Sequence, residues 1–286
     1  MNSVDLPAGT IEYREEGDPA GPPVVLLHGL LMNDALWEPA LPLLPSGFRY
    51  LLPVLPLGGH RSPMRPGADL TMPGMAGIVA DFLDALDLAD VTLVVTDWGG
   101  PLFLIDMGRA TRVGRLVICP CEAFDNFPPG LPGKVVALAV RNDLTLRVTL
   151  RMLKAGWLRR LRPVFGMMAK KPVPQGIVDA WLAHALADGR IRRDLTKYCR
   201  TRFDRDQLIR ATNALSGFPG PALVLWSDNP VMPRRHADRL AALLPGAASG
   251  HIDEAYVLTM LDQPAQTAAR IGAFLRQSTG VSPKSC

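Results

Sequence analysis

The sequence predicts an α/β fold: a doubly wound, mostly parallel sheet with a helical insertion between the two halves of the sheet. Short, apolar, β-branched runs alternate with helix-like apolar spacing before Phe124 and again after Pro221. The intervening stretch is helical in pattern, basic and short of strands. The expected division is a core formed by residues 1–124 and 217–277, a helical cap at 125–216 and a flexible tail at 278–286.

Each expected element follows from a local pattern. Strands are short apolar runs, and helices have apolar residues three or four positions apart. The expected strands are residues 11–15, 24–27, 50–54, 91–95, 116–119 and 221–226. The expected core helices are residues 74–88, 101–108, 234–244 and 263–275. A stretch rich in Pro and Gly, residues 126–133, separates the first half of the core from the insertion.

The most informative motif follows the strand at residues 91–95. The strand stops at Asp97, two glycines come two positions later, and a helix-like pattern begins. A strand, a tight turn and a helix in that order form a nucleophile elbow, which holds one side chain on a strained turn above the sheet. A carboxylate at that place attacks carbon, expels a leaving group and becomes an ester that water must hydrolyse. A second role for Asp97, capping the following helix, is compatible with the first.

With His28-Gly29 after an early strand and with the helical insertion, this elbow resembles that of the α/β-hydrolase superfamily over about residues 10–276. Residues 94–100, Val-Val-Thr-Asp-Trp-Gly-Gly, look most like haloalkane dehalogenases, and epoxide hydrolases come next. Two other stretches, residues 55–63 and 122–129, resemble a branch usually labelled only as hydrolase. The resemblance implies an α/β-hydrolase fold, a small-molecule substrate, Asp97 as the nucleophile, and no metal or organic cofactor.

The resemblance also assigns the groups around Asp97. The backbone N–H groups of Leu30 and Trp98 would form an oxyanion hole. The indole N–H of Trp98 would stabilise a departing halide, because an indole can only donate a hydrogen bond. Leu30 stands where one dehalogenase group has Asn, so the second halide donor would be a cap tryptophan. The expected pocket residues are Trp98, Trp157, Trp181 and Tyr198.

The base that hydrolyses the ester is harder to place. His251 is the only histidine in the late loop where the superfamily carries it. The usual pattern puts the histidine five residues before an Asp-x-Pro signature, but here Asp262 lies eleven residues beyond His251, and Val257 takes the aligned position. Either the loop carries an insertion or the base is absent. The acid that orients the histidine is Glu122 or, alternatively, Asp228.

Two alternatives to a dehalogenase-like hydrolase stay open. Epoxide hydrolases need two cap tyrosines, and only Tyr198 lies in the cap; Leu31 also replaces the Pro of their His-Gly-x-Pro motif. The other alternative belongs to a different class. It is a ligand-binding protein, or one catalysing an elimination or cyclisation, that keeps the fold without a working catalytic histidine.

The formal charge of +4 hides an uneven distribution. Residues 134–210 carry 18 Lys or Arg against 6 Asp or Glu, whereas the remainder carries 13 against 21. The basic segment is a solvated helical surface, or it attracts an anionic substrate, an acyl-carrier partner or a membrane surface. Nucleic-acid motifs and spans of about 18 apolar residues are missing from the sequence. Residues 1–17 have no signal-peptide core, so we expect a cytoplasmic protein, with a homodimer left open.

Overall fold

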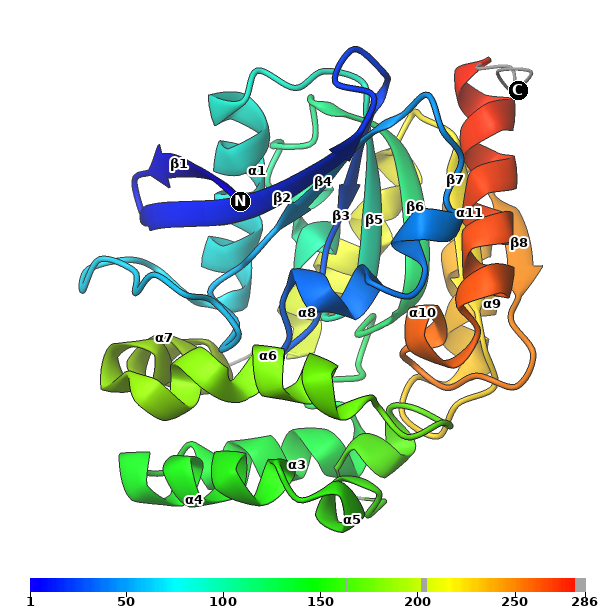
Figure 1. The fold of residues 1–286 in the computed structure, drawn as a ribbon. Helices are drawn as coiled ribbons and strands as arrows, with labels where there is room; N and C mark the ends of the chain where they lie inside the picture. Colours follow the sequence, from blue (N-terminus) through cyan, green and yellow to red (C-terminus); the bar gives the residue numbers. More distant parts are fainter. Residues whose placement is uncertain (163, 202–204, 281–286) are drawn as a thin grey trace.

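A single eight-stranded sheet organises the chain in the computed structural model, which describes residues 1–162, 164–201 and 205–280. The strand order is β1-β2-β4-β3-β5-β6-β7-β8 (Figure 1). The pairs β1–β2 and β2–β4 are antiparallel, and every pair from β4–β3 to β7–β8 is parallel. The structure therefore confirms the predicted doubly wound, mostly parallel sheet.

The elements have the following bounds. The strands are β1 (Asn2–Leu6), β2 (Gly9–Gly17), β3 (Pro23–Leu26), β4 (Arg49–Pro53), β5 (Val91–Asp97), β6 (Val113–Cys121), β7 (Ala222–Trp226) and β8 (Ala248–His251). The α-helices are α1 (Met72–Ala85), α2 (Phe103–Asp106), α3 (Gly130–Ala139), α4 (Asp143–Leu153), α5 (Gly156–Arg159), α6 (Gln175–Ala187), α7 (Gly189–Cys199), α8 (Arg205–Asn213), α9 (Arg234–Leu243), α10 (Thr259–Asp262) and α11 (Pro264–Thr279). Short 3₁₀ turns are η1 (Asp34–Trp37), η2 (Leu41–Leu43), η3 (Gly100–Leu102), η4 (Phe165–Met167) and η5 (Ala214–Gly217).

The sequence missed the two edge strands. β1 and β8 lie at opposite edges of the sheet, and the four residues of β8 are only partly buried, so they lack the apolar run of an inner strand. The predicted helix at 101–108 is split into η3 and α2. At the C-terminus α11 continues through Thr279, so the start of the expected flexible tail is helical. Residues 281–286 of that tail lie outside the described residues.

The helical insertion between β6 and β7, for which we keep the name cap as a label, forms two helical layers. In Figure 1, α6 and α7 lie next to the carboxyl ends of the strands, and α3, α4 and α5 lie beyond them. α4 packs on both α6 and α7, whereas α8 packs against α2 of the core. None of the described helices combines the length and the apolar character that crossing a membrane requires.

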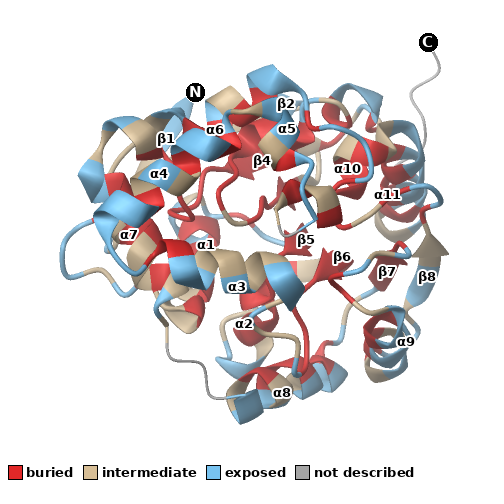
Figure 2. Ribbon diagram, turned by 90° about the horizontal axis from the view of Figure 1, so that it is seen from below, coloured by how far each residue is buried: buried red, intermediate tan, exposed pale blue. Residues whose placement is uncertain are grey.

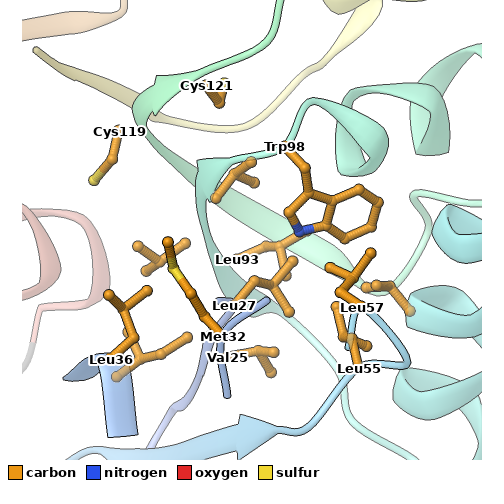
Figure 3. Packing of buried hydrophobic residues seen from close by; sticks show 14 of the residues in the cluster. Val25, Leu27, Met32, Leu36, Leu55, Leu57, Leu93, Trp98, Cys119 and Cys121 are labelled. Atoms are coloured by element: carbon orange, nitrogen blue, oxygen red, sulfur yellow. The ribbon is translucent and has the colours of Figure 1, made fainter. Parts of the chain in front are cut away.

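The core lies on both faces of the sheet. All seven residues of β5 are buried, as expected for a strand with neighbours on both sides and helices above and below. Trp98, which directly follows β5, belongs to the same buried cluster as Leu55, Leu57 and Leu93 (Figure 3). The end of β5 is thus supported by close packing, and the turn that follows has a rigid base.

One buried carboxylate ties the cap to the core. Asp262 is fully buried at the end of α10. Its Oδ2 accepts the backbone N–H groups of Lys170 at 2.8 Å and Tyr256 at 2.9 Å, and its Oδ1 accepts that of Lys171 at 2.7 Å. Lys170 and Lys171 belong to the cap, and Tyr256 belongs to the loop after β8. Asp262, part of the Asp-x-Pro signature, therefore has a structural role.

Replacing Asp262 with Ala should lower the free energy of unfolding by about 3 kcal/mol, because three backbone N–H groups lose a charged acceptor. The matched control is Asp253→Ala, which removes a carboxylate whose side chain is 79% exposed and should change stability by less than about 1 kcal/mol. Urea unfolding followed by circular dichroism measures both. Equal urea midpoints for the two variants would contradict the role of Asp262 in joining the cap to the core.

Candidate active site

The turn after β5 has the geometry of a nucleophile elbow. Asp97, the last residue of β5, has a φ of +65°, a left-handed conformation that costs energy for a residue with a side chain. A Cβ at Gly99 would lie 2.1 Å from the Glu122 carbonyl oxygen, and one at Gly100 would lie 1.7 Å from the Trp98 ring. Both positions therefore require glycine, and Asp97 is held where β5 meets η3.

The loop after β3 holds the Asp97 carboxylate. The Leu30 N–H donates to Asp97 Oδ2 at 2.8 Å. A Cβ at Gly29 would lie 2.2 Å from that same oxygen, so only glycine allows this close approach. The other expected donor, the Trp98 N–H, instead donates to the Thr96 carbonyl at 2.8 Å. Of the two predicted oxyanion-hole groups, only Leu30 contacts the carboxylate, and Oδ1 accepts no hydrogen bond within the described part of the chain.

Asp97 and Glu122 form a buried pair of carboxyl groups. Burial raises the pKa of Asp97 to about 6, and the Leu30 N–H partly opposes this. Glu122 directly follows β6, and burial followed by the charge of Asp97 raises its pKa well above the usual range. Both carboxyl groups therefore hold a proton more tightly than usual, and the charge of an ionised Asp97 strengthens this effect at Glu122.

A cavity of about 440 Å³ lies over these two groups. The cap provides most of its wall, and the lining is predominantly apolar. Lining residues include Leu30, Phe127, Val136, Leu150, Leu153 and Phe165. Lysine and arginine are missing from the lining as far as the chain is described, so the cavity lacks the cations that an anionic substrate would need. A neutral, apolar ligand fits these walls better.

Tyr198 on α7 adds a polar group to this wall. Its ring lies edge-on to Trp98, with 6.2 Å between ring centroids. Its hydroxyl is buried, and no described residue hydrogen-bonds to it. A buried hydroxyl without a partner costs free energy unless a ligand or water satisfies it. Tyr198 is therefore available to donate a hydrogen bond to a bound molecule.

The expected tryptophan donors are placed differently. The Trp98 ring lines the cavity, but its Nε1–H donates to the His28 carbonyl at 2.9 Å and is not free for a halide. Trp157 on α5 is 71% exposed, and it does not line the cavity. Trp181 on α6 is fully buried and packs against Phe165, one layer behind the lining. Of the four expected pocket side chains, only Tyr198 offers a free donor to the cavity.

The structure does not bring His251 to Asp97. His251 ends β8 at the edge of the sheet, three strands from β5, which corresponds to about 14 Å between backbones. Its Nε2 lies 3.6 Å from Asp253 Oδ1 and 3.8 Å from Asp228 Oδ2, and a third of the side chain is exposed. The alternative acid, Asp228, therefore accompanies His251 at the surface. Val257, which takes the aligned base position, is fully buried.

Three of the other histidines, His28, His60 and His236, contact neighbouring residues away from the cavity. His28 is buried; its Nδ1 lies 2.9 Å from the Gly29 carbonyl, and its Nε2 accepts the Leu55 N–H at 2.8 Å. Burial lowers the pKa of His28 to about 4, so the ring is neutral, with the proton on Nδ1. His60 lies 3.4 Å from Asp194, and His236 packs on Phe124. Among the described residues, no histidine lines the cavity.

Comparison with known proteins agrees with this fold. Residues 24–270 match the model of the Alpha/beta hydrolase family. A haloalkane dehalogenase of Mycolicibacterium paratuberculosis is 31% identical over 158 residues, which are 48% of this chain and 52% of that protein. The matched region thus spans only about half of that relative.

Solved structures show the same architecture. A putative ancestral haloalkane dehalogenase is 19% identical with a TM-score of 0.72, and the match covers 98% of this chain and all of the other. An epoxide hydrolase is 17% identical with a TM-score of 0.74, covering 96% and 98% of the two chains. At these identities the likeness concerns the fold.

Replacing Asp97 with Asn should stabilise the protein at pH 7.5. The raised pKa means that the folded protein binds the Asp97 proton more tightly than the unfolded chain does. The free energy of unfolding therefore falls as pH rises from about 4 through about 6. The difference corresponds to about 3 kcal/mol at pH 7.5, and Asn tolerates the left-handed backbone. Thermal unfolding at pH 4 and pH 7.5 tests this. The stability gained by Asp97→Asn over wild type should be larger at pH 7.5 than at pH 4. An equal gain at both pH values would contradict the raised pKa of Asp97.

Proposed function

Because this chain belongs to the alpha/beta hydrolase family, we propose that it is an enzyme in which Asp97 attacks a carbon atom of a neutral, apolar small molecule. One observation carries the proposal: an ionised Asp97 on a strained elbow is held at Oδ2 by the Leu30 N–H, at the base of an apolar cavity. The free Oδ1 is the attacking atom, and the product of the first step is an alkyl ester on Asp97.

The first candidate substrate is a haloalkane. The carboxylate oxygen bonds to carbon as the carbon–halogen bond breaks, and the halide leaves with the electron pair. The Tyr198 hydroxyl is the donor for that halide, because the Trp98 N–H is already committed to His28. The names of the relatives, haloalkane dehalogenases, support this substrate class.

The second step needs a base other than His251, and we assign it to Glu122. Esterification removes the charge of Asp97, which is one of the two causes that raise the pKa of Glu122. Glu122 then gives its proton to solvent more readily, and its carboxylate takes a proton from water as the water oxygen attacks the ester carbonyl. The leaving alkoxide takes the second proton of that water and departs as the alcohol, Asp97 returns to its carboxylate form, and the proton given to solvent balances the released halide.

An epoxide is the second candidate, and the raised pKa of Glu122 favours it. Asp97 opens the ring while the protonated form of Glu122, favoured by its raised pKa, supplies a proton to the developing alkoxide, which Tyr198 also orients. Glu122 is then ionised and ready to accept a proton from water. The diol leaves, and both carboxyl groups return to their first state without an outside proton.

Incubation with a pool of bromoalkanes and epoxides, followed by intact-protein mass, tests these roles. Wild type should release product with little adduct, whereas Glu122→Gln should accumulate an alkyl ester from a bromoalkane, because hydrolysis slows by at least 100-fold. With an epoxide the same variant also loses the proton donor of the first step, so its hydroxyalkyl ester should form more slowly. Asp97→Asn should form no adduct. The added mass separates an alkyl group from a hydroxyalkyl group.

The matched control for the base is His251→Gln, which should behave as wild type. An ester on His251→Gln but not on Glu122→Gln would overturn the assignment of Glu122 and restore the histidine. No adduct and no product with any of these proteins would instead favour the ligand-binding or non-hydrolytic alternatives.

Ester formation should follow the ionisation of Asp97. Since the pKa of Asp97 is raised to about 6, the single-turnover rate of Glu122→Gln should fall about tenfold per pH unit below that value and level off above it. Quenched samples measured by mass between pH 4.5 and 8 give this profile. A rate independent of pH over that range would exclude Asp97 as the titrating nucleophile.

A further inference from the structure

The outer face of the cap gathers most of the exposed apolar side chains. Of the ten large hydrophobic residues that are exposed in the described part of the chain, seven lie between residues 131 and 161. We call this set the cap patch: Leu131, Leu138, Leu144, Val148, Met152, Trp157 and Leu161. Monomeric proteins rarely expose such a concentration of apolar side chains, so the patch marks an interaction surface.

Helix α4 shows how the patch is built. Leu146, Leu150 and Leu153 form its buried face, which packs toward α6 and α7. At 100° per residue, Leu144 and Val148 lie on the opposite face, with Arg147 and Arg151 beside them. α4 therefore has two apolar faces, one for the protein interior and one for solvent, and the solvent face carries cations. In Figure 2, exposed turns of α3 and α4 face the viewer.

The patch is strongly basic. Residues 131–162 contain eight Lys or Arg and one acidic residue, Asp143. Asp143 is itself paired with Arg192. Arg159 is buried and Lys154 is paired with Asp179, and the other six cations of this segment outnumber its one carboxylate, so the apolar side chains lie in a positive field.

The cavity opens within this surface. Met152 and Leu161 are about half exposed, and both also line the cavity over Asp97. Ala137 on α3 is likewise exposed and lines the cavity. A molecule that enters the cavity between these residues therefore passes directly from the surface or partner that contacts the cap patch.

We propose that the cap patch docks on an anionic lipid surface and that apolar ligands enter the cavity from the lipid. Leu and Trp beside Lys and Arg is the composition of helices that lie in a membrane interface. The positive charge complements anionic headgroups. A second copy of the chain is disfavoured, because a symmetric pairing would place one basic patch against another. The docking surface needs no assumption about the reaction of Asp97.

Trp157 provides a direct probe. It is 71% exposed, whereas Trp37, Trp98, Trp181 and Trp226 are at most 2% exposed. Vesicles of equal parts phosphatidylglycerol and phosphatidylcholine should shift the tryptophan emission to shorter wavelength and carry the protein into the pellet on sedimentation. Vesicles of phosphatidylcholine alone should do so weakly, and Trp157→Phe should remove the spectral shift.

Two double variants separate charge from apolar contact. Arg147→Gln/Arg151→Gln should weaken partitioning about 25-fold at low salt, at about fivefold per charge. Leu144→Ser/Val148→Ser should weaken it about tenfold. The matched controls are Arg234→Gln/Arg235→Gln on α9 and Leu43→Ser/Met107→Ser on the core, which should bind as wild type.

Failure to bind phosphatidylglycerol vesicles at low salt would overturn the proposal, as would equal losses in patch and control variants. So would a concentration-dependent dimer that Trp157→Ser abolishes without any vesicle binding, since it would assign the patch to a second copy. Sedimentation has no catalytic readout, so an inactive but vesicle-bound protein would refute the proposed reaction and leave this inference intact.

Discussion

The hydrogen bond from the Leu30 N–H to Asp97 Oδ2 is the contact on which the site depends. It joins the loop after β3 to the elbow after β5, which is possible because β3 and β5 are neighbours in the sheet. Gly29 permits the approach, and the Trp98 indole fixes the same loop through the His28 carbonyl. These contacts hold Asp97 in a left-handed conformation that a free chain would leave.

The same packing limits the chemistry of the site. Burial raises the pKa of Asp97 and of Glu122, and the charge of Asp97 raises the pKa of Glu122 further. A neighbouring histidine would normally supply the second proton transfer, but His251 lies at the sheet edge with Asp228 and Asp253. Two carboxyl groups with separated pKa values can divide acid and base roles between them, which is the arrangement that the proposed mechanism uses.

The sequence could predict features that depend on neighbouring residues. The parallel sheet, the turn at Asp97 and the helical insertion between β6 and β7 follow from local apolar spacing and glycine positions. It could not predict that the Trp98 N–H donates to His28, because that bond joins residues 70 positions apart. Nor could it place His251, since the four residues of β8 have no apolar run to reveal an edge strand. Tyr198 was identified by type, but its unpartnered hydroxyl emerges only from packing.

The cap carries its basic residues and its apolar cavity wall on different faces, which the sequence alone does not separate. Its basic residues were consistent with an anionic substrate or with a membrane surface. In the structure the inner wall is apolar and faces two carboxyl groups, an environment that repels an anion, while the cations lie on the outer face beside exposed Leu and Trp. The positive charge on the outer face therefore selects the surface on which the cap docks, and the apolar cavity wall selects the ligand that enters. An apolar ligand dissolved in lipid fits both features, because it makes apolar contacts along the whole path from the cap patch to Asp97.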